Sequence, residues 1–164
     1  MKNTHRIAAA FAVAAAAIGA GAALVSAQDD GASQTATLFP YDDAAVVAEG
    51  QTLYESFCAS CHGANLEGQD NWRERGPNGR ALAPPHDETG HTWHHPDLQL
   101  FQIVKFGTAA LVGDGYESDM AGYGEVMTDD EIRAVMAYIK STWPEEIIER
   151  HDEMNAALAR ELGG

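Results

Sequence analysis

The chain has 164 residues, of which 45% are hydrophobic, and a formal net charge of −15 at pH 7. This length is enough for one domain but not comfortably for two. The acidity excludes nucleic acid and anionic lipid headgroups as binding partners, and it predicts that docking partners present basic or uncharged surfaces.

The N-terminus has the pattern of an export signal. A short basic head precedes an uncharged, alanine-rich run over residues 7–25, and small residues then predict cleavage after Ala27. The alternative is an uncleaved membrane anchor, because a helix of that length spans about 28 Å. Removing residues 1–27 takes away two of the ten basic residues and none of the 25 acidic ones, so the mature charge is −17. In either case we expect the folded part to work in a bacterial periplasm, with membrane contact only through an uncleaved leader.

The first half of the remaining chain contains one helical pattern and one long irregular stretch. Residues 28–42 are small and polar and predict a flexible lead. A helix is expected from Asp43, an N-cap candidate, to Phe57, where the cysteine motif begins. From 63 to 95 glycines and prolines interrupt every hydrophobic period. A loop this long inside a compact domain needs an organiser other than protein, and a bound cofactor would be one.

Three further helices are predicted, and a second glycine-rich stretch at 107–127 interrupts them. They cover residues 96–106, 128–143 and 144–164. A capping box of Thr128 and Glu131 gives the middle one the strongest pattern. The last is charged and amphipathic and extends beyond a domain that we place at 43–143. No convincing strand is indicated, so the fold class is all-α.

The only two cysteines stand in the string Cys58-Ala-Ser-Cys61-His62. A disulfide across two residues would close a tiny loop and stabilise the domain little. A redox dithiol would need a βαβ context, and a zinc site would need further ligands, for which only the histidine-rich stretch 86–95 offers candidates. The Cys-x-x-Cys-His string instead lets two thiols add across the vinyl groups of a haem, with the next imidazole beneath the iron. We therefore predict one covalent haem c, attached to Cys58 and Cys61 and ligated by His62.

At these residues the chain resembles the class I c-type cytochromes, a family of mono-haem proteins. Gly50 and Tyr54 lie eight and four residues before Cys58, where the family has a glycine and an aromatic. The family packs these against an aromatic of its C-terminal helix, for which Tyr138 is the counterpart. The resemblance covers about residues 43–143. It implies a cytochrome c fold, all-α, with three to five helices and long loops wrapped around one covalently bound haem.

The resemblance also implies a second axial ligand, Met120. This residue lies in a glycine-rich loop eight residues before Thr128, and Tyr123 stands where the family has a pocket aromatic, although Ala121 replaces the proline that commonly follows the ligand. The other methionines beyond the leader have packing roles. The rival ligand is a histidine, which would lower the reduction potential relative to His/Met iron. The candidates are His86, His91, His94 and His95. These histidines could otherwise line the haem edge, cap the helix at Pro96 or bind a second metal.

The family also predicts a pocket around the haem. In the family, the ring N–H of the ligand histidine that does not face the iron donates a hydrogen bond to a proline carbonyl. Pro84 is the matching residue here, and Pro85 follows it directly. The haem propionates are expected to meet the indole of Trp93 or one of three loop arginines. These are Arg73, Arg75 and Arg80. Trp72 and Trp93 could equally be core residues.

Three functions are compatible with these features. The first is a periplasmic single-electron carrier with His/Met-ligated haem iron, which is not an enzyme. The second is a haem c electron-transfer subunit of a larger periplasmic or membrane oxidoreductase, with residues 144–164 as an interaction element. The third is a ligand-binding protein with five-coordinate haem, as in the cytochromes c′, but those carry the attachment motif near the C-terminus and lack a ligand methionine.

Overall fold

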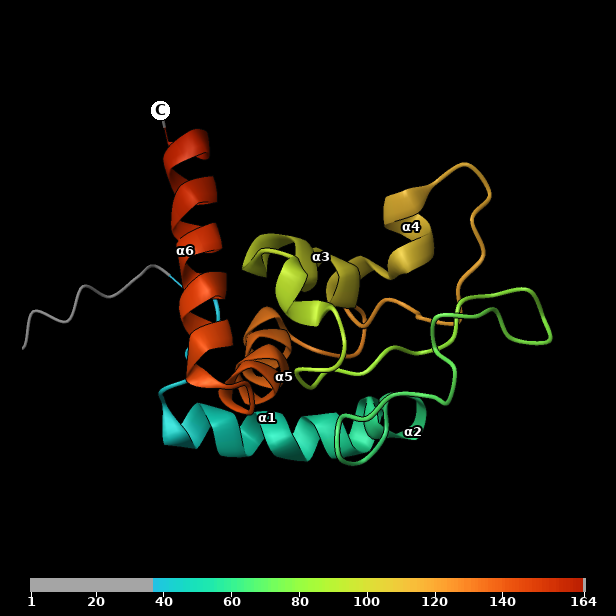
Figure 1. Cartoon of the computed structure of the whole chain (residues 1–164), viewed down its shortest axis with the longest axis horizontal. Coiled ribbons are helices and arrows are strands. Elements are labelled where there is room, and N and C mark those ends of the chain that lie inside the picture. Colours follow the sequence, from blue (N-terminus) through green and yellow to red (C-terminus); the bar gives the residue numbers. More distant parts are fainter. Residues whose placement is uncertain (1–36, 164) are drawn as a thin grey trace, which may run out of the picture. The chain divides into compact units, whose positions relative to one another are not determined.

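The computed structural model describes residues 37–163, so the leader predicted at 1–27 lies outside the described part. Its helices are α1 (Ala44–Phe57), α2 (Ala59–His62), α3 (Asp97–Phe106), α4 (Thr108–Val112), α5 (Asp129–Ser141), α6 (Glu145–Leu162) and a 3-10 turn, η1 (Thr92–His94) (Figure 1). Within residues 37–163 there are two isolated β-bridges and no strand. The predicted all-α class is confirmed, with four long helices, α1, α3, α5 and α6, and two short ones.

Local capping signals explain where the long helices begin. The carboxylate of Asp43 accepts hydrogen bonds from the backbone of Ala45 and Val46 at the start of α1. Thr128 and Glu131 form a reciprocal capping box at the start of α5. Both satisfy backbone N–H groups that have no partner inside the helix. At the start of α3 the backbone nitrogen of Asp97 donates to the side chain of Asn155 at 2.8 Å, so neither His94 nor His95 caps this helix.

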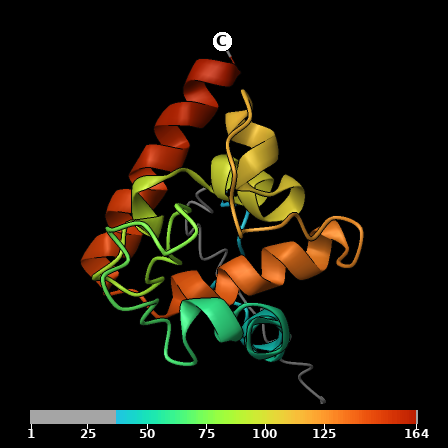
Figure 2. The same ribbon diagram turned by 90° about the vertical axis from the view of Figure 1, so that its right-hand side faces the viewer.

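The central contact of the fold is the crossing of α1 and α5, which both views of the ribbon show (Figures 1 and 2). The helices approach most closely at Gly50, where an added Cβ would lie 1.9 Å from the carbonyl oxygen of Ala134. One turn further on, the rings of Tyr54 and Tyr138 pack with centroids 5.5 Å apart. The structure thus brings together the glycine and the two aromatic residues that the resemblance pairs.

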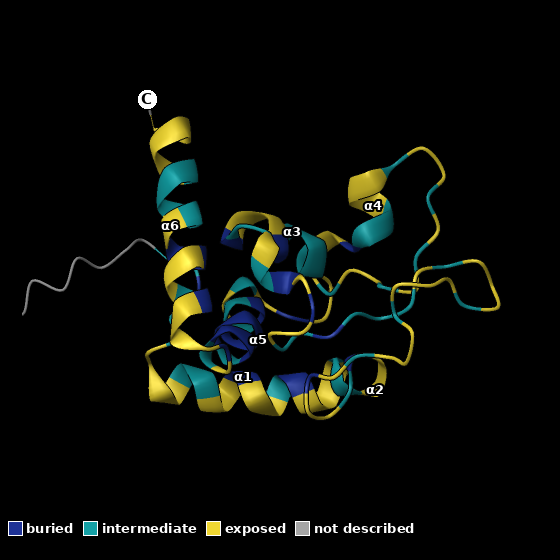
Figure 3. Cartoon of the chain, viewed as in Figure 1, coloured by how far each residue is buried: buried dark blue, intermediate teal, exposed yellow. Residues whose placement is uncertain are grey.

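The core lies along the inner face of α5. Ile132, Val135, Met136 and Ile139 are each no more than 2% exposed, and this repeat is the apolar stripe that the sequence predicts. In Figure 3 α5 is dark blue over most of its length, whereas α1 buries only one side. The fully buried ring of Tyr54 comes from that side of α1.

Residues 37–42, the end of the predicted flexible lead, are part of the folded body. Phe39 is fully buried, and the hydroxyl of Thr37 lies 2.8 Å from a carboxylate oxygen of Asp97 at the start of α3. Apolar burial and side-chain hydrogen bonds hold this segment, although its sequence has no periodic pattern.

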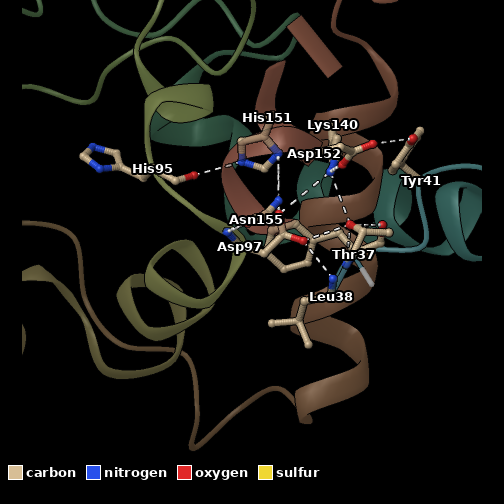
Figure 4. Close-up of polar contacts among 10 residues, drawn as sticks. Thr37, Leu38, Tyr41, His95, Asp97, Lys140, His151, Asp152 and Asn155 are labelled. Carbon is tan, nitrogen blue, oxygen red and sulfur yellow. Dashed lines mark hydrogen bonds and ion pairs between the residues drawn. The ribbon is translucent and has the colours of Figure 1, made fainter. Parts of the chain in front are cut away.

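A buried polar cluster joins this segment to α3, α5 and α6 (Figure 4). It consists of Thr37, Tyr41, Asp97, Lys140, His151, Asp152 and Asn155. The ammonium of Lys140, which is fully buried, contacts Asp152 at 2.5 Å and Asp97 at 3.9 Å. Because α6 supplies His151, Asp152 and Asn155, this helix is an integral part of the folded body as far as Asn155.

Two short elements lie inside stretches that the sequence leaves irregular. The turn η1 interrupts the long loop after α2, and α4 follows Gly107 directly. Gly107 has φ +81°, and an added Cβ would lie 2.6 Å from the backbone nitrogen of Gly122, so this position requires glycine. No helix within residues 37–163 is long and apolar enough to cross a membrane.

Candidate functional site

The cysteine motif forms the junction between α1 and α2. Cys58 ends the first helix and begins the second, and the single turn of α2 carries Cys61 and His62. The two cysteines form no disulfide bond with each other. Burial, together with the neighbouring Cys61, raises the pKa of Cys58 to about 11, so its sulfur remains protonated at neutral pH.

A hydrogen bond to Nδ1 holds the imidazole of His62 in one orientation. Its Nδ1 lies 2.8 Å from the carbonyl oxygen of Pro84, the contact that the resemblance implies. The ring is 7% exposed, and burial lowers its pKa, although the bond to Pro84 opposes that shift. A neutral imidazole whose Nδ1 donates this bond presents Nε2 as a free ligand atom.

The loop that supplies Pro84 packs tightly against the motif. An added Cβ at Gly68 would lie 2.4 Å from the backbone nitrogen of Pro85, and the hydroxyl of Tyr54 donates to the carbonyl oxygen of Gly63 at 2.8 Å. These contacts fix the backbone that follows His62 and hold it against the loop that carries Pro84.

A second imidazole, that of His86, lies flat against the first. The ring centroids of His62 and His86 are 4.1 Å apart with an interplanar angle of 23°. Nδ1 of His86 lies 2.8 Å from the hydroxyl of Thr92. Burial, with His62 and His91 nearby, lowers the pKa of His86 well below its ordinary value. Since the ring of His86 stacks on that of His62, it would lie on the same side of a bound haem as this ligand, and it does not suit the role of the second ligand.

A cavity of about 1300 Å³ opens in front of the motif. Cys58, Cys61 and His62 line one wall, and Val135, Met136 and Ile139 of α5 line another. Pockets for drug-sized molecules are about 300–1,000 Å³, so this one has room for a larger group. Its apolar walls, two cysteine thiols and neutral imidazole fit the covalent haem that the motif predicts.

Met120 also lines this cavity, in a loop that is anchored to the end of α3. The backbone nitrogens of Tyr123 and Gly124 donate to the carbonyl oxygens of Val104 and Lys105, at 2.9 and 3.0 Å. The backbone nitrogen of Thr108 donates to the carbonyl of Met120 at 3.3 Å. In both ribbon views α3 lies above α2, the helix that carries His62 (Figures 1 and 2).

Two of the other methionines of the described part have the packing roles that the sequence predicts. Met127 and Met136 are 5% and 2% exposed and belong to the core. Met136 also lines the cavity, on the wall formed by α5. Met154 lies on α6 and does not line the cavity. Met120 is therefore the cavity methionine that lies in a loop rather than in the helical core.

Of the two aromatic residues at the predicted pocket, one lines the cavity. Tyr123 does so, and its hydroxyl donates to the carbonyl of Phe57 at 3.0 Å. Trp93 does not: its indole donates to the carbonyl of Glu88 at 3.3 Å, and its ring stacks on His94. The structure therefore does not place Trp93 in the lining of this cavity, and its contact with a propionate stays a prediction.

The polar end of the cavity is formed by Trp72, Arg73, His91 and His95. The ring of Trp72 stacks on His91 with centroids 5.3 Å apart, and the guanidinium of Arg73 lies 4.2 Å from the Trp72 centroid. This end suits carboxylates such as the haem propionates. Sequence reasoning considered Arg73 but offered no signal to prefer Trp72 over Trp93.

The histidine-rich stretch forms no second metal centre in the described part of the chain. No group of three or more His, Cys, Asp or Glu side chains among residues 37–163 is arranged to hold a metal ion. The rings of His91 and His95 lie 5.4 Å apart in an edge-to-face contact. This arrangement supports neither the zinc alternative nor a copper site.

Comparison with known proteins gives one match. The family model for cytochrome c matches residues 47–143, which is more than half of the chain. Neither curated proteins nor solved structures gave a significant match.

Proposed function

Because this chain belongs to the cytochrome c family, we propose that it is a periplasmic single-electron carrier whose haem iron is ligated by His62 and Met120. Cytochromes c bind haem c covalently, and Cys58 and Cys61 are the two thiols for that attachment. When bound, the haem supplies one-electron chemistry at its iron.

One observation carries this proposal: a single cavity is lined by both thiols, by the neutral imidazole of His62 and by the thioether of Met120. Pro84 orients the imidazole, and the backbone of α3 positions the methionine loop. Two protein ligands leave no iron site for a substrate, so the role is electron transfer and not catalysis. A thioether ligand also favours a more positive potential than a second imidazole would.

The rim of the cavity supports a docking surface for the redox partner. Phe57, Leu111 and Val112 line the cavity and are 38%, 42% and 55% exposed. The chain around this apolar rim is strongly acidic. A partner with a basic or uncharged surface would fit it, through the small, weak interface that rapid electron transfer requires.

Location outside the cytoplasm is part of the proposal. Haem c is attached in exported proteins, and the first 27 residues have the pattern of an export signal. The alternative role as a subunit of a larger oxidoreductase receives no separate support from α6, because the first half of this helix packs into the folded body.

The test is the absorption spectrum of the oxidised haem protein, compared between Met120→Leu and Met136→Leu. Both methionines line the cavity, and the same volume-conserving substitution is made at each. We expect the far-red sulfur-to-iron band in the wild type and in Met136→Leu, and its loss in Met120→Leu.

Loss of the band in Met136→Leu alone would make that residue the ligand. A wild type that lacks the band, and whose reduced form binds carbon monoxide readily at neutral pH, would support the five-coordinate alternative.

A further inference from the structure

The segment that leads into Met120 has few contacts with the rest of the protein. Among the hydrogen bonds of the described residues, only three join 114–119 to anything beyond its flanking residues Gly113 and Met120. All three come from the loop 76–81, which lies far away in the sequence. On the other side of Met120, by contrast, backbone bonds to α3 fix the chain.

Two of the three bonds come from one guanidinium, and the third comes from a neighbouring side-chain amide. Arg80 donates from Nη1 to Asp119 at 2.5 Å and from Nη2 to Glu117 at 3.2 Å. Asn78 donates its side-chain amide to the second oxygen of Asp119 at 3.0 Å. We call this group, Asn78, Arg80, Glu117 and Asp119, the Arg80 clasp.

The loop that presents Arg80 is itself closed. The backbone nitrogen of Gly76 donates to the carbonyl of Arg80 at 2.9 Å, and the side chain of Asn78 accepts from the backbone nitrogen of Arg80 at 3.0 Å. Asn78 and Asp119 both line the cavity next to Met120. The clasp therefore joins two walls of the cavity at the residue that directly precedes Met120.

We propose that Arg80 is a positioning residue that holds the Met120 loop closed over the haem. The inference rests on the proposed role of Met120 as a ligand. The planar guanidinium engages two carboxylates with two separate N–H groups, which a lysine ammonium does not reproduce. Isolated surface ion pairs contribute little, but paired bonds from one arginine in a network are the exception. The guanidinium is 34% exposed, so added salt weakens the clasp without abolishing it.

The clasp also separates the roles of the three loop arginines. Arg80 is engaged by Glu117 and Asp119, and Arg75 donates to the carbonyl of Gly79 within its own loop at 2.9 Å. Of the three, this leaves Arg73 to contact a haem propionate at the polar end of the cavity.

The experiment measures how easily an added ligand displaces Met120 in the oxidised haem protein. Imidazole is titrated into wild type, Arg80→Gln, Arg80→Lys and Arg160→Gln, and loss of the sulfur-to-iron band reports displacement. We expect Arg80→Gln to bind imidazole about two- to fivefold more tightly, as the loss of a paired surface interaction implies. Arg80→Lys should lie between it and the wild type, and Arg160→Gln, an exposed position on α6 away from the cavity, should match the wild type. Raising the salt concentration should tighten imidazole binding to the wild type and leave Arg80→Gln nearly unchanged.

The double variant Glu117→Gln/Asp119→Asn tests the same clasp from its exposed side, where the side chains are 71% and 55% accessible. It should reproduce the effect of Arg80→Gln, and it serves in its place if that variant does not fold. Equal imidazole affinity in all variants, with the band present in the wild type, would overturn the clasp alone. Absence of the band from the wild type would overturn Met120 ligation and the clasp with it.

Discussion

At the scale of single residues, the hydroxyl of Thr92 is a buried link behind the ligand histidine. It lies 2.8 Å from Nδ1 of His86 and 3.4 Å from the carbonyl oxygen of Pro85, and Thr92 is 5% exposed. The ring of His86 in turn stacks on His62. Replacing Thr92 by valine keeps the shape but leaves the ring nitrogen without a partner. We expect the free energy of unfolding of the haem protein, measured with denaturant, to fall by about 1–3 kcal/mol.

Thr89→Val is the matched control, because its exposed hydroxyl bonds only to Asp87 in the same turn, at 2.6 Å. A surface substitution of this kind should change stability by less than about 0.5 kcal/mol. Equal losses of unfolding free energy for the Thr89 and Thr92 variants would mean that the buried bond between Thr92 and His86 stabilises the protein no more than a surface bond does.

Residues differ in how far their roles could be predicted. The attachment motif could be predicted because its chemistry is contained in five consecutive residues, Cys58 to His62. The choice between Trp72 and Trp93 could not, since both lie in aperiodic sequence. The direction of each indole depends on a distant contact, such as the stacking of Trp72 on His91. The partners of Arg80 escaped prediction for the same reason, because they lie 37 and 39 residues away.

At the scale of elements, the crossing of α1 and α5 depends on Gly50. An added Cβ would meet the carbonyl oxygen and carbon of Ala134 at 1.9 and 2.5 Å, and these backbone atoms cannot move without shifting α5. Helix propensity favours Gly50→Ala by about 1 kcal/mol. Overpacking of a tight contact costs about 1–3 kcal/mol or more, so we expect a net loss of unfolding free energy in denaturant titrations.

Ala48→Gly separates the two effects, because Ala48 is exposed on the same helix. Propensity alone predicts a loss of about 1 kcal/mol there and a gain at Gly50→Ala. A measured gain at position 50 would show that the helices can separate at little cost.

Elements with local signals were predictable, and elements without them were not. The capping box at Thr128 marks the start of α5, and Gly107 marks the end of α3. The five residues of α4 are too few for a periodic pattern. Their position depends on the turn at Gly107 and on the hydrogen bond from Thr108 to the Met120 loop. Residues 37–42 escaped prediction because isolated contacts hold them, namely the buried ring of Phe39 and the side-chain hydrogen bonds of Thr37 and Tyr41.

At the scale of the whole described unit, the C-terminal helix supports the segment that borders the cavity. The indole of Trp143 donates to the carbonyl of His86 at 2.8 Å, and Nε2 of His151 donates to the carbonyl of His95 at 2.9 Å. Asn155 accepts from the backbone nitrogen of Asp97 at 2.8 Å. Trp143 lies just before α6 and fixes one end of residues 86–97, whereas α6 fixes the other end through His151 and Asn155. Residues beyond 143, where the family match ends, therefore support one end of the segment that borders the cavity.

The buried polar cluster makes stability depend on pH through His151. Burial and the ammonium of Lys140 lower the pKa of this fully buried imidazole, against the opposing effect of Asp97 and Asp152. The unfolded chain takes up a proton near pH 6.5, whereas the folded chain does so only at lower pH. The contribution of His151 to the free energy of unfolding should therefore be level above about pH 7.5 and fall below about pH 6.5, by at most about 1.4 kcal/mol per pH unit. The lowered pKa of His86 adds to the fall in the same direction.

Unfolding titrations of the haem protein between pH 7.5 and 5.5 test this for wild type, His151→Gln and His94→Gln. His151→Gln should be less stable at pH 7.5 but lose less on acidification, while the exposed His94→Gln should follow the wild type. If the wild type and His151→Gln instead show the same slope, Asp97 is the residue responsible. Oδ1 of Asp97 is buried without a hydrogen-bond partner in the described part and lies 3.5 Å from Nδ1 of His151. If the slope of the wild type equals that of His151→Gln, a proton on His151 is stabilised by Asp97 as much as burial disfavours it.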